Sequence, residues 1–255
     1  MRLSPRAMRR PIKEQMLVQS VWIIFQDNWV MFTKAAGITL ELTALSLFFA
    51  TFIGLFVAFL KVSRVRVLNI IADGYIGLIR GLPLIVQLMF LYFGISTILT
   101  LPRFWAGSLA LAIHAGAYVA EIFRGAIQSI DRGQVEAARS LGMKQSLAMR
   151  RVILPQAALR AIPPLGNQFI IGLKDSSLVA YLGVLELYGA ALLVQAENFE
   201  PFQTYFVAGM YYLVMVIVFT LILKKLEGRL AVSTRPGGSG DKPKRPRPRP
   251  EGAAT

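Results

Sequence analysis

Long apolar runs alternate with short charged segments along this chain, and the alternation predicts helices that cross a membrane. Such a helix needs about 20 mostly apolar residues to span the hydrocarbon core. Four runs come close to this length and contain no Lys, Arg, Asp or Glu: residues 42–60, 81–102, 104–120 and 201–223. The pattern predicts an all-α integral membrane protein.

A fifth passage is predicted over residues 162–183, within an apolar region that extends from 161 to 196. Lys174, Asp175 and Glu186 interrupt this region. We interpret the residues after 183 as a short helix that returns along the outer surface. The sequence thus predicts five transmembrane helices.

The amino-terminal segment differs from these runs because it mixes apolar and polar residues. Residues 16–34, with Trp22 and Trp29, are interpreted as an amphipathic helix that lies at the membrane interface. The alternative is a further spanning helix, which would return the amino terminus to the cytoplasm. A cleavable signal peptide is not indicated, because the apolar core 22–25 is short and no small-residue cleavage site follows it.

The basic loops predict the orientation of the chain in the membrane. Lys and Arg are concentrated in residues 61–66, in 136–155 and in the tail 224–249, whereas 197–200 is acidic. Because cytoplasmic loops are rich in Lys and Arg, the three basic regions are expected inside. Five passages then place the amino terminus outside, although it carries five cations: Arg2, Arg6, Arg9, Arg10 and Lys13.

Three regions follow from these patterns. Residues 1–34 form the basic amino-terminal segment with its interfacial helix, and residues 35–231 form the transmembrane domain. Residues 232–255 are rich in proline, glycine and charge, so they are expected to form a disordered, basic cytoplasmic tail. The expected role of this tail is a solvated tether that touches anionic membrane lipid.

The composition agrees with a membrane protein and narrows its chemistry. The chain has 255 residues, of which 55% are hydrophobic, and a mean hydropathy of +0.55. With no cysteine and one histidine, it cannot form disulfides, thiolate metal sites or a histidine cluster for a metal. Its net charge of +14 would suggest nucleic acid in a soluble protein. Here the cations flank apolar runs, so membrane orientation explains them and no nucleic acid is expected.

Residues 136–155, EAARSLGMKQSLAMRRVILP, form a charged segment between apolar runs. Good helix formers fill residues 134–147, and Glu136 is expected in the first turn, where the helix dipole favours a carboxylate. Gly142 is expected to break the helix in a turn. A second helix is expected to follow, until Pro155 changes the direction of the chain.

The order of residues in this segment is similar to the EAA loop of ABC importer permeases. The residues that carry the resemblance are Glu136, Ala137, Ala138, Gly142, Leu154 and Pro155, with Val152 where the family usually has Ile. The stretches RGLPLIVQLMFLYFG, AYVAEIFRGAIQSI and PPLGNQFIIGLKDSSLV resemble the polar amino acid branch, which imports amino acids such as glutamate, glutamine, histidine or arginine. Leu82 and Ser176 stand where that branch usually has Thr.

The resemblance implies a type I ABC importer permease fold and an ATP-driven importer in a bacterial inner membrane. The implied partners are an ATP-binding subunit, a second permease that is identical or homologous, and an extracytoplasmic amino-acid-binding protein. The chain has no Walker motif, so ATP and Mg²⁺ are expected on the partner and this subunit is not itself an enzyme. The EAA loop is expected to dock on the ATPase, with Glu136 pairing with an arginine of that partner.

His114, Tyr118 and Glu121 share one helix face and are candidates for the substrate pathway. Polar groups in membrane helices are costly and usually face protein or water. Alternatively, Glu121 pairs with Arg124 or Arg80, and His114 is a packing residue.

Four further pathway candidates come from the other passages. Lys174 and Ser176 interrupt an apolar run, and irregular polar backbone at membrane depth is tolerated where it lines a cavity. Gln87 and Asn167 are uncharged candidates that could hydrogen-bond to a substrate. The alternatives are that Lys174 and Asp175 neutralise each other, and that the two amides hold helices together.

Two other functions remain open from the sequence alone. An ion-coupled secondary transporter would need a coupling-ion site and typically inverted repeats, neither of which is evident. A membrane scaffold that transports nothing is the other alternative.

Overall fold

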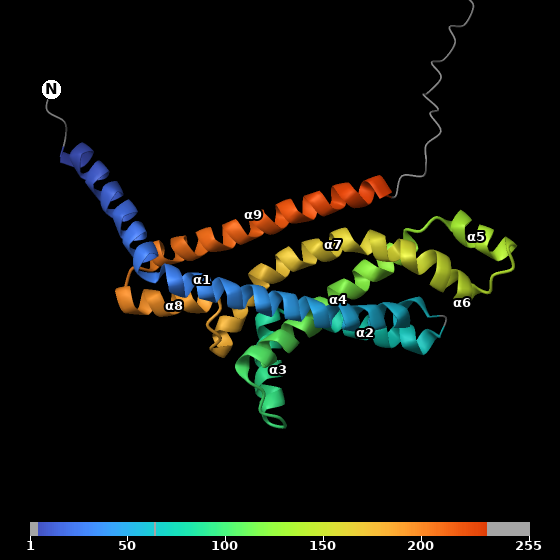
Figure 1. Ribbon diagram of the computed structural model, residues 1–255. Coiled ribbons are helices and arrows are strands. Elements are labelled where there is room, and N and C mark those ends of the chain that lie inside the picture. Colours follow the sequence, from blue (N-terminus) through green and yellow to red (C-terminus); the bar gives the residue numbers. More distant parts are fainter. Residues whose placement is uncertain (1–4, 64, 234–255) are drawn as a thin grey trace, which may run out of the picture.

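The computed structural model describes residues 5–63 and 65–233, with side chains described for 18–63, 65–94 and 97–229. The described chain is built of helices, as predicted (Figure 1). A π-helical turn, Met149–Ile153, precedes α7, and a 3₁₀ helix, Ser176–Leu182, follows it. The α-helices are α1 Pro5–Val62, α2 Arg66–Gly81, α3 Leu84–Ser96, α4 Arg103–Gln128, α5 Arg132–Ser140, α6 Gln145–Ala148, α7 Leu154–Asp175, α8 Leu187–Asn198 and α9 Pro201–Ser233.

The number of membrane passages agrees with the five that were predicted. In the described part of the chain, α1, α4 and α9 are each long and apolar enough to cross a membrane, and two bent helix pairs raise the total to as many as five. The second passage is not one straight helix, because α2 and α3 meet at 109°. The bend lies at Leu82 and Pro83, where proline disfavours the α conformation of the residue before it.

Helix α1 corrects part of the prediction for the amino-terminal segment. Residues 16–34 are not a separate helix, since α1 continues unbroken from Pro5 to Val62, although Figure 1 shows that it bends near its amino-terminal end. Ile24 and Phe32 are buried against α8 and α9. The boundary expected between residues 34 and 35 therefore lies inside one packed helix. The tail from 234 onward lies outside the described residues.

Small residues let α1 cross α4 closely. Gly54 is buried, and a Cβ built on it would lie 2.5 Å from Cγ1 of Val119 and 2.8 Å from the backbone nitrogen of Ala120. Gly116 makes the reciprocal approach on α4, where its Cβ would lie 2.7 Å from a methyl carbon of Ile53. Such small-residue contacts hold membrane helices together, because lipid supplies no hydrophobic drive between them.

Helix α8 also differs from its prediction. The short helix after residue 183 is present, but it is not confined to the surface. Leu187, Ala190 and Ala191 are fully buried in a cluster that α1 and α9 complete. The predicted surface helix is therefore part of the core at the end of the molecule that lies opposite α5 and α6 (Figure 1).

Candidate functional site

Helix α5 begins the EAA segment, and its first turn is capped by a residue that the sequence analysis did not select. The Asp131 carboxylate accepts a hydrogen bond from the Gly133 amide at 2.6 Å. This is a typical amino-terminal cap. Glu136 lies in the second turn, not the first as predicted, and its side chain is exposed. Its carboxylate forms no ion pair with any described cation, so it is available to a partner.

Gly142 ends α5 in the left-handed conformation that glycine adopts without strain. Its φ is +79°. The Met143 amide donates to the Ala138 carbonyl at 3.1 Å, and the Gly142 amide donates to the Arg139 carbonyl at 2.9 Å. These two bonds form a Schellman motif, so the predicted break is confirmed together with its cause.

The chain does not change direction at Pro155, contrary to the prediction. Helix α6, the π-helical turn and α7 follow one another without a gap, and Pro155 occupies the first turn of α7, where its missing amide hydrogen costs little. Leu154 is half-buried in an apolar cluster with Ile127, Ile130 and Ile153. This cluster fixes the EAA segment to the end of α4.

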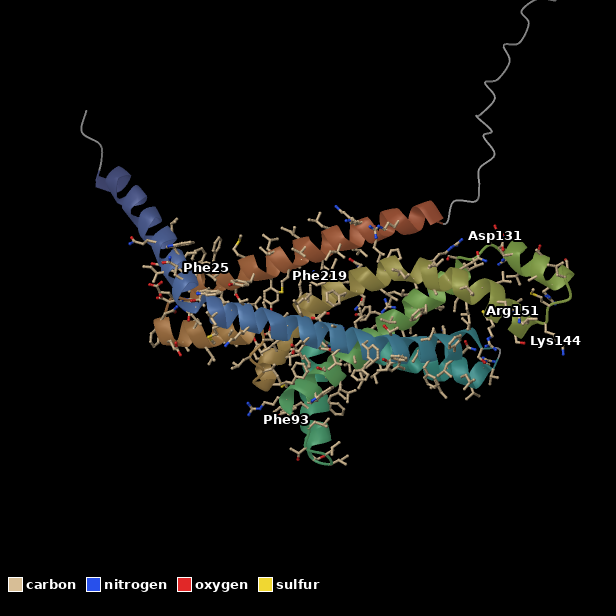
Figure 2. The ribbon with its side chains drawn as sticks, viewed as in Figure 1. Phe25, Phe93, Asp131, Lys144, Arg151 and Phe219 are labelled. Carbon is tan, nitrogen blue, oxygen red and sulfur yellow. The ribbon has the colours of Figure 1, made fainter. Side chains whose placement is uncertain are left out.

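The outer face of the EAA segment exposes apolar side chains beside charged ones. Ala138 is buried, whereas Ala137, Leu141 and Leu147 are exposed beside the charged side chains. Figure 2 shows Asp131, Lys144 and Arg151 at the end of the molecule opposite Phe25. An apolar strip rimmed by charge is typical of a docking surface for another protein.

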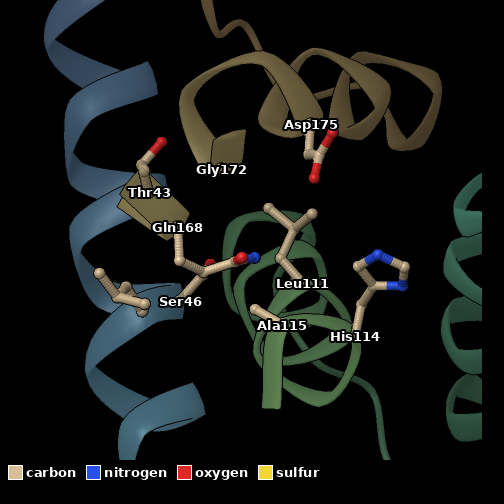
Figure 3. Close-up of a pocket in the computed structure, with 9 residues that line it drawn as sticks. Thr43, Ser46, Leu111, His114, Ala115, Gln168, Gly172 and Asp175 are labelled. Carbon is tan, nitrogen blue, oxygen red and sulfur yellow. The ribbon is translucent and has the colours of Figure 1, made fainter. Parts of the chain in front are cut away.

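A second candidate site is a small cavity with a mixed polar and apolar lining between α1, α4 and α7 (Figure 3). Its volume of about 20 Å³ has room for about one water molecule. Figure 3 shows Asp175, His114 and the Gln168 amide directed toward the same space. The lining residues are Thr43, Ser46, Leu47, Leu111, His114, Ala115, Gln168, Gly172 and Asp175.

Gln168 and Asp175 are the lining residues whose polar groups are available for hydrogen bonds to a bound solute. Among the residues whose side chains are described, neither forms a hydrogen bond to a protein group, although Gln168 is buried. The Ser46 hydroxyl donates to the Ser108 carbonyl at 3.1 Å, and the Thr43 hydroxyl donates to the Thr39 carbonyl at 2.8 Å. The cavity therefore offers a carboxylate and an amide, with both hydroxyl protons already engaged.

Three of the predicted pathway residues, Gln87, His114 and Tyr118, lie together and contact one another. His114 Nδ1 lies 3.1 Å from Oε1 of Gln87, and its ring lies 5.2 Å from that of Tyr118. The Gln87 amide nitrogen donates to the carbonyls of Ile79 and Leu82, across the α2–α3 bend. Gln87 thus stabilises the bend, and His114 alone of the seven predicted residues lines the cavity.

The other predicted residues lie elsewhere. Arg124 donates three hydrogen bonds to the Glu121 carboxylate, the shortest at 2.7 Å, so the local pairing that was the alternative is observed. Ser176 is fully buried, and its hydroxyl donates to the Leu173 carbonyl in the last turn of α7. Lys174 and Asn167 are exposed. In addition, Lys174 does not form an ion pair with Asp175, within the part of the chain that is described.

Sequence reasoning missed Thr43, Ser46, Gln168 and Asp175 as a group, because they lie on two helices far apart in the chain. Spacing gave a partial signal: Gln168 and Asp175 are seven residues apart, and Thr43 and Ser46 are three apart, so each pair shares a helix face. Nothing in the sequence shows that these two faces meet.

Glu186 forms a buried network that was also missed. It is fully buried before α8, where its Oε1 accepts from the Gly189 amide at 2.7 Å. Its Oε2 accepts from the Tyr212 hydroxyl at 2.8 Å and from the Thr39 hydroxyl at 3.3 Å. Thr39 in turn accepts from the Leu187 amide at 3.0 Å. The network joins α1, α8 and α9.

The family of the chain follows from a comparison with known proteins. A family model described as the inner membrane component of binding-protein-dependent transport systems matches residues 50–232. The chain belongs to this family. It is therefore a membrane-embedded permease subunit, and the EAA segment and the cavity belong to a transport protein.

Two curated relatives resemble this permease along most of its length. The glutamine transport system permease protein GlnP of Escherichia coli (strain K12) is 37% identical over 218 residues, which cover 84% of this chain and 100% of that protein. The probable glutamine ABC transporter permease protein GlnM of Bacillus subtilis (strain 168) is 37% identical and is covered to 99%.

Solved structures support the same architecture. A chain of an amino acid ABC transporter with histidines is 38% identical and has a TM-score of 0.74. The match covers 90% of this chain and 100% of that chain. A chain of the inward-facing MetNI methionine ABC transporter has a TM-score of 0.70 at 22% identity, and the match covers 82% of this chain and 99% of that chain. This second likeness is one of fold alone. The predicted type I importer permease fold is confirmed.

Proposed function

We propose that this permease is the membrane subunit of an ATP-driven importer for a polar amino acid, with glutamine or glutamate the first candidates. The cavity between α1, α4 and α7 is the observation that carries the proposal. The Asp175 carboxylate suits an ammonium group, and the Gln168 amide can donate to a carboxylate and accept from an amide. Charged groups leave water at a high cost unless such partners replace their hydration.

The size of the cavity adds a condition to this mechanism. Room for about one water molecule is too little for an amino acid, so α1, α4 and α7 must part before the solute passes. The energy for this motion is proposed to come from ATP bound with Mg²⁺ on a partner ATPase that docks on the EAA segment. A solute-binding protein is proposed to deliver the amino acid from outside a bacterial inner membrane.

Reconstitution tests the proposal. The permease, its ATPase and its solute-binding protein are placed in vesicles, and uptake of glutamine, glutamate, arginine and histidine is measured with and without ATP. ATP-dependent uptake of at least one of them is expected. Uptake driven by an ion gradient without ATP would identify a secondary transporter instead, and no uptake of any of the four would contradict the proposal.

The docking role of the EAA segment is tested at Gly142. Gly142→Val forces a β-branched residue to φ +79°, whereas Gly142→Asn tolerates that conformation. The Val variant is expected to lose ATPase binding and uptake, and the Asn variant to keep most of both. Normal copurification of the ATPase with the Val variant, with normal uptake, would remove the docking assignment.

A further inference from the structure

Two backbone carbonyls fix the orientation of the Gln87 side-chain amide at the bend between α2 and α3. Nε2 of Gln87 donates to the Ile79 carbonyl at 2.7 Å and to the Leu82 carbonyl at 2.8 Å. A carbonyl oxygen can only accept, so the end of the amide that faces both carbonyls must be its NH₂ group. Oε1 therefore lies at the opposite end, where it can accept a hydrogen bond but has no hydrogen to donate.

This orientation determines which ring nitrogen of His114 carries a proton. His114 Nδ1 lies 3.1 Å from Oε1 of Gln87, which is a hydrogen-bond distance. Because Oε1 cannot donate, Nδ1 must supply the hydrogen. A neutral imidazole carries one N–H, so its other nitrogen, Nε2, keeps a free lone pair and is an acceptor.

The surroundings of the ring favour its neutral form. The centres of the His114 and Tyr118 rings are 5.2 Å apart, and the Arg80 guanidinium lies 5.3 Å from the centre of the same tyrosine ring. An imidazolium would add a second positive charge near Arg80, and a charge at membrane depth is costly. Asp175 lies across the cavity from His114, but the two form no ion pair in the described part of the chain. The neutral ring is therefore expected.

Nε2 of His114 faces the cavity between α1, α4 and α7. His114 lines this cavity, whereas Gln87 is not part of its lining. In Figure 3, one ring nitrogen of His114 is turned toward the side of the cavity on which Asp175 lies. Since Nδ1 is engaged by Gln87, this nitrogen is Nε2. The cavity therefore receives an acceptor from His114, and not a donor.

Acceptors outnumber donors among the side chains that line the cavity. Asp175 contributes a carboxylate and His114 contributes Nε2, while the hydroxyl protons of Thr43 and Ser46 are engaged with backbone carbonyls. Among the described lining residues, only the Gln168 amide has hydrogens to donate to a solute. A solute rich in N–H groups matches this lining, whereas a second carboxylate would meet further acceptors and lose its hydrogen bonds with water.

We propose that His114 is a specificity-determining residue of the transport pathway and that Gln87 positions it. Nε2 accepts a hydrogen bond from a side-chain N–H of the solute, while Asp175 binds the solute ammonium. The pathway thereby favours amino acids with an amide, guanidinium or imidazole side chain, such as glutamine, over glutamate. This inference rests on the proposed function, because it requires the solute to pass through this cavity.

The protonation of His114 can be measured directly, because it is the single histidine of the chain. The full-length permease, with a purification tag that lacks histidine, is produced with isotope-labelled histidine and studied in lipid vesicles by solid-state NMR. Near neutral pH, Nδ1 is expected to carry a proton and Nε2 to carry none. A proton on Nε2, alone or together with one on Nδ1, would overturn the proposal.

Two glutamine variants test the positioning role of Gln87 in the same measurement. Gln87→Leu removes the acceptor of Nδ1 and should allow the proton to move to Nε2 in a measurable share of the molecules. Gln156→Leu is the matched control, because the Gln156 amide donates to the Val152 carbonyl one turn back and should leave the spectrum unchanged. A wild-type spectrum from folded Gln87→Leu protein would contradict the positioning role.

Uptake by the reconstituted complex tests the contact with the solute. The ATPase and the solute-binding protein are the same in every sample, so differences between variants arise in the permease. His114→Leu removes the acceptor and should lower glutamine uptake about fivefold, whereas His114→Gln keeps an oxygen acceptor at similar reach and should retain most of it. Equal losses in the two variants would reduce the ring to a packing role, and undiminished uptake by His114→Leu would exclude contact with the solute. Either result overturns the proposal.

The wild-type complex distinguishes failure of this inference from failure of the proposed function. Each solute is supplied at a concentration that saturates the solute-binding protein, so that the permease limits uptake. ATP-dependent uptake of glutamine, arginine or histidine is expected to exceed that of glutamate. Glutamate uptake that equals or exceeds that of the other three would overturn the specificity assigned to His114 and leave the importer intact. No ATP-dependent uptake of any of the four would contradict the proposed function and this inference with it.

Discussion

Asp175 precedes the 3₁₀ helix and Glu186 follows it, and the two carboxylates differ in how many hydrogen bonds they accept. Glu186 is fully buried and accepts hydrogen bonds from Gly189, Tyr212 and Thr39. Asp175 is half-buried, lines a cavity, and accepts no hydrogen bond from the described side chains. A saturated carboxylate stabilises the fold, whereas one without partners is free to bind a solute. Burial or charge alone would not separate these two roles.

The largest effect is expected from removing the saturated carboxylate. Glu186→Ala leaves the Tyr212 hydroxyl and the Gly189 amide without an acceptor and removes the cap of α8. Each buried group left unpaired costs about 1–3 kcal/mol, so a loss of about 3 kcal/mol or more in unfolding free energy is expected. Melting in detergent, followed by tryptophan fluorescence, measures it. A wild-type melting temperature would place Glu186 among the dispensable polar groups.

Asp175→Asn should affect transport and leave the fold intact. Because the carboxylate accepts no hydrogen bond from any side chain that the structure describes, melting should be unchanged, while loss of a charge-assisted bond to the solute should lower uptake about tenfold or more. The neighbouring Lys174→Gln, at an exposed residue, serves as the control and should transport normally. Uptake is counted per assembled complex. A loss in the Lys174 variant alone would reverse the assignment of the two residues.

Two adjacent tyrosines, Tyr211 and Tyr212, test how much the hydrogen bonds to Glu186 contribute to stability. Tyr212→Phe removes one donor to the buried carboxylate and should cost about 1 kcal/mol of stability. Tyr211→Phe removes a hydroxyl that lies 3.2 Å from the Thr33 hydroxyl at an exposed position, so it should cost clearly less. Chemical denaturation of both variants measures the difference. Equal losses would show that the network contributes nothing beyond an ordinary surface contact.

The smallest effect is expected at Ser176, between the two carboxylates. Its hydroxyl donates to the Leu173 carbonyl one turn back, and such local bonds add little to a helix. Ser176→Ala should change stability by less than about 0.5 kcal/mol, with wild-type uptake. A marked loss of uptake would mean that this hydroxyl turns toward the solute during transport.

The fold was largely predictable because apolar runs, basic loops and the EAA pattern are local features of the sequence. Gly142 could be identified as a break because few other residues suit a left-handed turn. The bend at Pro83 was less predictable, since the run 81–102 has no charged residue to divide it. The burial of α8 was not predictable either, because the sequence of α8 does not show that α1 and α9 pack against it.

The cavity was the hardest feature to predict, for a physical reason. Its polar residues come from α1, α4 and α7, and only helix packing brings them together. The stripe of His114, Tyr118 and Glu121 was visible in the sequence. Gln87 and Arg124 bond to His114 and Glu121, and Arg80 lies over the Tyr118 ring. Periodicity identifies a face of a helix, whereas the partners on that face are set by residues far away in the chain.

The close crossing at Gly54 gives α1 the geometry of a lever. Val62 lies eight residues to one side of this pivot and Phe32 lies 22 to the other, so the arms measure about 12 Å and 33 Å. If α1 tilts about this pivot, a displacement of about 1 Å at Val62 becomes almost 3 Å beside α8. A small motion at the short end would thereby be amplified at the other end, without any change in the length of the helix.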